Sequence, residues 1–203
     1  MTVGVAPSAD GPIGTALKEW ATVTHLLAEG RYTLVLRKGG IREAGGPGKF
    51  KLEHQRFALF PAWEHEKPHW LKPQARAVSS AAAPATSGRP DRLHLTAWAE
   101  LGRAWVVPSR SAFDTLDDLH PWLPPQIDLR FNYKAFRPLY LLALRVRRLS
   151  TPRVVPNRAA YDGCKSWVPL DPADAVAPSG AETAMSDQTF TSICARVDAA
   201  FGA

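Results

Sequence analysis

Two Glu–His pairs, Glu53–His54 and Glu64–His65, are of the residue types that acid–base or metal chemistry requires. Carboxylates and imidazoles transfer protons near neutral pH and also bind divalent ions. The two pairs flank a strand-like run at residues 56–61, so they meet at one ion only if the chain turns back sharply at Pro61. The sequence therefore leaves open an enzymatic function, as a nuclease or as a hydrolase of phosphate-bearing substrates. It predicts no metal or cofactor.

Cys164, in the stretch YDGCKSW, is a further candidate nucleophile because the cation Lys165 follows it. No GxSxG elbow is present, and the two cysteines of the chain do not form a CxxC motif. The stretch TLVLRKGGIRE could suggest a phosphate loop. The segment around Gly48 and Lys49 lacks the first glycine and the Ser/Thr of that motif, so a hairpin corner at residues 39–40 is favoured.

Positive charge is concentrated in one part of the chain. The protein carries 25 Lys and Arg against 19 Asp and Glu, a net charge of +6. Residues 130–165 hold nine of the basic residues and a single acid, Asp162, so this window carries +8 and the remainder −2. A basic segment of this kind attracts phosphate-rich partners, although a solvated face that maintains solubility is the alternative.

Aromatic and basic side chains alternate in RFNYKAFRP, residues 130–138. Grooves that bind single-stranded nucleic acid combine cations for the phosphates with rings on which bases stack. We therefore predict a nucleic-acid-binding protein, for RNA or a single strand, with a basic–aromatic groove. Its predicted binding residues are Arg37, Lys38, Arg130, Tyr133, Lys134, Phe136, Arg137, Arg145, Arg147, Lys165 and Trp167. A scaffold that binds no small ligand is a third possibility.

The order of elements indicates the α+β class. Hydrophobic spacing predicts helices over residues 15–29, 111–120 and 186–201, the first closed by Gly30 and the second capped by Ser111. It predicts strands over 32–37, 56–61, 92–108, 138–149 and 165–170. Because strands do not alternate with long helices, a curved, mostly antiparallel or barrel-like sheet with flanking helices is expected. Residues 1–13 form an expected disordered lead, and 14–203 a single domain with a loop insertion at 79–90.

The sequence also favours a cytoplasmic protein without a membrane partner. The N-terminus has no basic and apolar signal segment, and the longest apolar run, residues 138–144, is too short to span a bilayer as a helix. The oligomeric state stays open.

Five stretches carry a family resemblance: ALKEW, LLAEGRYTLVLRKGGIRE, FALFPAWEH, RPLYLLALRVRRL and YDGCKSWVPL. Together they resemble a bacterial and archaeal domain-of-unknown-function family, DUF1802, which implies no activity. The block GRYTLVLR is also similar to the start of ASCH and PUA-like domains, whose motif is Gly-x-Lys-x-x-Glu-x-Arg. Gly30 and Arg37 match it, whereas Tyr32 and Val35 occupy the Lys and Glu positions. This likeness implies a partly closed PUA-like barrel that binds RNA or modified bases.

Overall fold

The computed structural model describes residues 11–38, 54–78 and 89–203. The strands are β1 Thr15–Trp20, β2 Leu34–Lys38, β3 Arg56–Ala62, β4 Arg92–Val106, β5 Leu139–Pro156, β6 Trp167–Pro169 and β7 Glu182–Thr183. The helices are α1 Ala21–Ala28, α2 Pro73–Arg76, α4 Arg110–Asp114, α5 Pro124–Asn132 and α6 Asp187–Phe201. Short 3-10 turns are η1 Pro68–Trp70, η2 Asp117–Leu119, η3 Ala159–Tyr161 and η4 Pro172–Asp174. Glu53, the corner at 39–40, residues 1–10 of the lead and 79–88 of the insertion lie outside the described residues.

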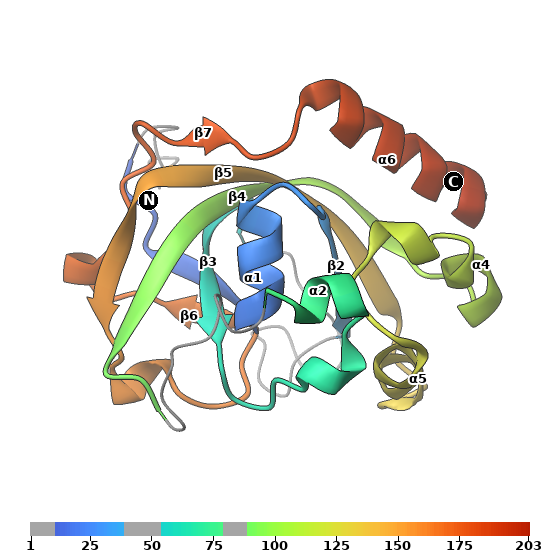
Figure 1. Ribbon diagram of the computed structural model, residues 1–203, viewed down its shortest axis with the longest axis horizontal. Helices are drawn as coiled ribbons and strands as arrows, with labels where there is room; N and C mark the ends of the chain where they lie inside the picture. The colour runs from blue at the N-terminus through green and yellow to red at the C-terminus, as the bar shows by residue number, and fades with distance from the viewer. Residues whose placement is uncertain (1–10, 39–53, 79–88) are drawn as a thin grey trace, which may run out of the picture.

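One sheet forms a curled half-barrel in which the strands follow the order β2-β5-β4-β3-β1-β6, with β7 beside β5. All neighbours in it are antiparallel except β1 and β3. The register of β4 against β5 shifts between Leu95 and Ala97 and again between Leu101 and Arg103. Such bulges bend a strand and increase its twist, so the long β4–β5 ribbon curls around α1 (Figure 1). The predicted fold class, α+β with a curved, mostly antiparallel sheet and flanking helices, is confirmed.

The predicted helix over residues 15–29 is wrong in its first half. Thr15–Trp20 is the strand β1, and α1 begins only at Ala21. From Ala16 to Trp20 every side chain of β1 is buried, and a strand buried on both faces lacks the alternation that identifies strands. Gly30 ends the helix as predicted, with φ of +68° and its N–H donating to the Leu27 carbonyl.

The main core lies between α1 and the concave face of the sheet. Leu26 and Leu27 of α1 pack in one cluster with Leu36 of β2, Phe57 of β3 and Leu141 of β5. A smaller cluster on the other side of β3 contains Phe60, Leu95, Val155, Tyr161 and Val176. Ile13, the last residue of the expected lead, is also buried there and pairs with Val176. Among the described residues no helix is long and apolar enough to cross a membrane.

The last part of the chain, residues 182–201 with β7 and α6, forms a C-terminal strap along β5 (Figure 1). The predicted C-terminal helix is confirmed as α6, whose first turn is capped by the Ser186 hydroxyl. The strap packs closely, because a Cβ on Gly102 would lie 2.4 Å from the Phe190 ring. Helix α4 is capped by Ser109 where Ser111 was predicted, and α5 was not predicted.

Candidate functional site: a basic cleft at the open seam of the half-barrel

A cleft of about 250 Å³ lies where the half-barrel stays open. Strands β2 and β6 are the two ends of the sheet order and do not pair with each other, which leaves a seam between them. The cleft is lined from both sides of this seam, by the ends of β1 and β2, the loop after β3, the end of α5 and the loop before β6. The lining residues are Lys18, Glu19, Trp20, Arg37, Lys38, Ala62, Glu64, His65, Arg130, Tyr133, Gly163, Cys164, Lys165 and Ser166.

Arg37 joins the two sides of the seam at the inner end of the cleft. Its guanidinium lies 3.0 Å from the Glu19 carboxylate and donates to the Lys18 carbonyl at 2.7 Å. The second oxygen of Glu19 accepts from the Trp20 N–H at 2.9 Å. The Arg37 and Glu19 side chains are only 9% and 4% exposed. A buried pair with this many hydrogen bonds holds β2 against β1, so the predicted groove residue Arg37 is also a structural link.

Lys18 holds two walls of the cleft together. Its ammonium donates to the carbonyls of Tyr161 at 2.9 Å and Gly163 at 3.1 Å, and it pairs with Glu64 at 3.2 Å. A lysine has three N–H donors, so these three acceptors satisfy it fully. The loop of Gly163–Ser166 is thereby fixed against the loop that follows β3.

The loop before β6 is also held by a second set of hydrogen bonds. The Tyr161 hydroxyl donates to Asp174 at 2.5 Å and accepts from the Asp171 N–H at 2.9 Å. The Arg158 guanidinium donates to the same Asp174 oxygen at 2.7 Å. Hydrogen bonds from Arg158 and Tyr161 hold the pKa of the Asp174 carboxyl below its usual range. This wall of the cleft is therefore rigid.

Three cations of the cleft face no carboxylate among the described residues. Lys38 donates to the Phe131 carbonyl at 2.6 Å, and Lys165 to the Ala160 carbonyl. Burial lowers the pKa of the Lys38 ammonium. Arg130 is half-buried at the end of α5. Since both acids of the cleft are already paired, with Arg37 and with Lys18, the cleft carries a surplus of three positive charges.

The predicted stacking residues divide between the rim and the core. Tyr133 lies at the rim and is 41% exposed. Trp167 is 9% exposed, with its ring edge-on to Phe57 at 5.0 Å and to His54 at 5.1 Å. Because the ring is buried within the main core cluster, Trp167 is a core residue. Phe136, with Lys134 and Arg137, lies on the turn after α5 and does not line the cleft.

The candidate catalytic residues are only partly brought together. Strand β3 runs straight through Pro61 to Ala62, so His54 and His65 lie beyond opposite ends of it. Glu64, His65 and Cys164 line the cleft. Within residues 11–38, 54–78 and 89–203, no three His, Cys, Asp or Glu side chains are grouped as metal ligands.

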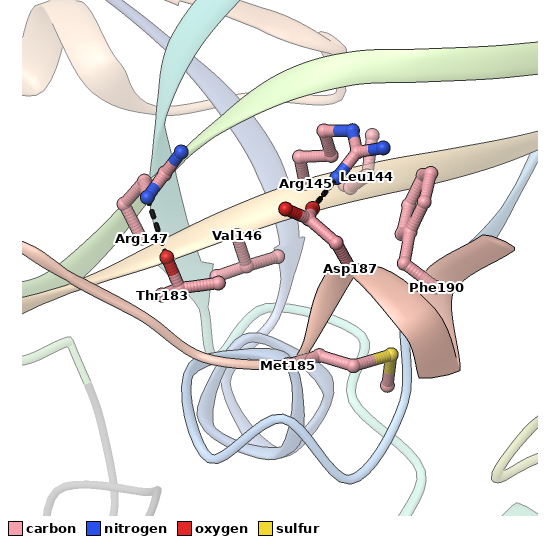
Figure 2. A pocket seen from close by; sticks show the side chains of 8 residues that line it. All are labelled: Leu144, Arg145, Val146, Arg147, Thr183, Met185, Asp187 and Phe190. Atoms are coloured by element: carbon pink, nitrogen blue, oxygen red, sulfur yellow. Dashed lines mark hydrogen bonds and ion pairs between the residues drawn. The ribbon is translucent and has the colours of Figure 1, made fainter.

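Arg145 and Arg147 lie outside the cleft, against the C-terminal strap (Figure 2). Arg145 pairs with Asp187 at the start of α6, and its guanidinium carbon lies 4.2 Å from the centre of the Phe190 ring. Arg147 donates to the Thr183 hydroxyl in β7. The hollow that they line has a volume of about 10 Å³, space for a single water. The predicted second groove wall is therefore a packing contact.

The sequence prediction missed Lys18, Glu19 and Trp20 because it assigned them to a helix. The available signal was the adjacent Lys and Glu in an otherwise apolar segment, since charged residues are seldom buried without a partner.

The fold and the cleft together define an α+β half-barrel with a basic site at its seam. The chain belongs to the family described as "Domain of unknown function (DUF1802)", which residues 16–196 match. No curated protein sequence matches the chain.

Two solved structures from Zymomonas mobilis are similar to this chain. The first, "Crystal structure of ASCH from Zymomonas mobilis", is 12% identical with a TM-score of 0.45, covering 79% of this chain and 89% of that one. The second, a mutant of ASCH from the same organism, is 11% identical with a TM-score of 0.47, covering 81% and 94%. Both bear the name of the ASCH domains that the N-terminal block resembles.

Proposed function

We propose that the protein binds nucleic acid, RNA or single-stranded DNA, with the phosphate backbone in the seam cleft. The observation that carries this proposal is the surplus of three cations, Lys38, Arg130 and Lys165, in a cleft whose two carboxylates are already paired. Phosphate oxygens are the acceptors that such a cluster attracts.

The hydrogen-bond capacity of these cations supports the proposal. Among the described residues, Lys38 and Lys165 each give one of three N–H donors to a carbonyl. Lys165 is half-buried and Lys38 is only 8% exposed, so Lys165 is the ammonium that a ligand reaches more easily. Arg130 adds a planar guanidinium with five donors, which suits a phosphate. The Tyr133 ring at the rim supports the proposal because an aromatic side chain beside bound phosphates can stack on a base.

A second candidate function is hydrolysis of a phosphate-bearing substrate in the same cleft. Glu64 and His65 can act as acid and base, and Cys164 is an exposed thiol. Release of fragments from end-labelled RNA by the wild-type protein, lost in His65→Ala, is the result expected from this alternative.

The binding proposal is tested by measuring affinity for a fluorescent single-stranded RNA at several salt concentrations. In the double variant Arg130→Glu with Lys165→Glu, we expect affinity at low salt to fall at least about tenfold. The slope of log affinity against log salt should decrease by about 1.4, because each lost phosphate contact removes about 0.7.

The matched control is Arg92→Glu with Arg148→Glu, which changes the net charge equally at two exposed sites outside the cleft. We expect its affinity to change less than about threefold by the loss of long-range attraction alone. Equal losses in the two double variants, or no binding by the wild type at low salt, would contradict a nucleic-acid site in the cleft.

A further inference from the structure

The turn that follows α5 presents two aromatic rings to solvent. Phe136 is 83% exposed, more than any other large apolar side chain in the described part of the chain, and Tyr133 is 41% exposed. Phenylalanine is usually buried, and an exposed ring that the fold does not use indicates a contact surface.

Each ring lies beside a cation. The Lys134 ammonium is 5.2 Å from the centre of the Tyr133 ring, and the Arg137 guanidinium carbon is 5.5 Å from that of Phe136. Neither cation has an ion-pair partner among the described residues, and the Nε and Nη1 atoms of Arg137 are buried without an acceptor there. The turn therefore combines aromatic faces with positive charge that the protein itself does not neutralise.

The backbone fixes this turn next to the cleft. Tyr133 donates its N–H to the Leu129 carbonyl at 2.9 Å, and Arg137 closes the turn by donating to the Lys134 carbonyl at 2.8 Å. Lys134 has a left-handed φ of +47°, which reverses the chain direction. Lys38 of the cleft donates to the Phe131 carbonyl two residues before Tyr133. Cleft and turn are thus one continuous surface.

We infer that the turn Tyr133–Arg137 is a stacking platform that extends the cleft, so that the ligand is a single strand whose unpaired bases stack on Tyr133 and then on Phe136. This inference rests on the proposed function. Bases in a duplex stack on one another and expose only their edges, whereas a single strand offers base faces to aromatic rings. The interleaved cations Lys134 and Arg137 favour a phosphate-linked ligand over an apolar protein partner.

The test compares binding by the full chain of a single-stranded RNA of about 24 nucleotides and of an RNA duplex of about 12 base pairs, which carries nearly the same charge. We expect Phe136→Ala to lower affinity for the single strand about five- to tenfold and to leave duplex affinity unchanged, because loss of stacking acts only on unpaired bases. Phe136→Trp should retain single-strand affinity. Val154→Ala, at an exposed apolar residue of β5 outside the cleft, is the control and should change neither.

The outcomes separate the platform from the cleft. If the wild type binds the single strand and Phe136→Ala binds it equally well, the platform is refuted and the cleft site stands. A Phe136→Ala variant that loses affinity for both RNAs equally also refutes it, because a stacking role cannot weaken the duplex. Binding of neither RNA by the wild type refutes both proposals. Thermal melting shows whether the variant is folded, as expected for a side chain that is 83% exposed.

Discussion

The cations of the cleft and those beneath the C-terminal strap have the same chemistry and different surroundings. Arg145 and Arg147 face Asp187, Phe190 and Thr183, and together they attach the strap to β5. Within the part of the chain that the structure describes, Lys38 and Lys165 face carbonyl oxygens and no carboxylate. A positive charge is available to a ligand where the protein supplies no carboxylate, and that depends on the fold more than on the local density of basic residues.

A similar division exists within the cleft. Lys18 and Arg37 at its inner end are satisfied by Glu64, Glu19 and backbone carbonyls. They close the seam and fix the walls, whereas Arg130 and Lys165 are half-buried and have no carboxylate partner among the described residues. The comparison therefore distinguishes positioning residues from contact residues, and the two kinds should respond differently to substitution.

The largest expected effect is at Lys18. Lys18→Met removes a buried ammonium and leaves Glu64 and the carbonyls of Tyr161 and Gly163 without their donor. We expect the free energy of unfolding to fall by about 3 kcal/mol, since the Tyr161 and Gly163 carbonyls are left without their donor where water reaches them poorly. Nucleic-acid affinity should fall too, because the Gly163–Ser166 wall loses its anchor.

Denaturant unfolding and the RNA titration measure these two effects on the same variant. Glu64→Gln is the control, because Lys18 keeps both carbonyl acceptors and Glu64 is 31% exposed. In Glu64→Gln the free energy of unfolding should fall by about 1 kcal/mol. Equal stability of Lys18→Met and the wild type would show that Lys18 does not hold the walls.

Low pH is expected to lower the stability of the region around His120, which contacts the C-terminal strap. His120 is fully buried and stacked on Phe113 at 4.8 Å, and neither of its ring nitrogens has a hydrogen-bond partner among the described residues. Burial, with the nearby charge of Lys72, lowers the pKa of His120 to about 4. Two residues earlier, Asp118 pairs with Arg196 of α6 at 2.7 Å, which links this region to the strap.

The folded state therefore binds a proton at His120 less readily than the unfolded chain, whose histidine titrates near 6.5. The stability from neutral His120 is complete above pH 6.5 and is lost as the pH falls toward 4. Unfolding at pH 5 should require about 2 kcal/mol less than at pH 7. His120→Leu should remove most of this difference, and an unchanged pH dependence in that variant would contradict the assignment.

The sequence predicts the fold class, and it names some of the residues that line the cleft. The strands over residues 32–37 and before Arg145 are recognisable as short apolar runs that end in basic residues, although every residue of β2 is buried. Of the residues predicted to bind nucleic acid, Arg130, Tyr133 and Lys165 line the cleft, and their role in binding stays a prediction.

The features of the fold and of the site that the sequence does not predict depend on contacts between distant segments. Strand β1 is buried on both faces, so its residues show neither strand nor helix periodicity clearly. Asp187 lies 42 residues beyond Arg145, outside the window in which charge was counted. Within that window Arg145 has no acidic partner, so it resembles a residue that binds a ligand. Trp167 is similar: its aromatic type fits stacking on a base, and only the fold shows that Phe57 covers it.

Arg145→Glu should give the smallest change in stability, and it distinguishes the cleft from the C-terminal strap most directly. Glutamate at this position would face Asp187 and lose the contact with the Phe190 ring. Because Asp187 is 83% exposed, water screens the pair, and we expect unfolding to require only about 1 kcal/mol less. Affinity for single-stranded RNA should change less than about threefold, as with the control charge reversals. Tenfold weaker binding at unchanged stability would instead place Arg145 on the nucleic-acid surface and reverse the roles assigned to the two clusters.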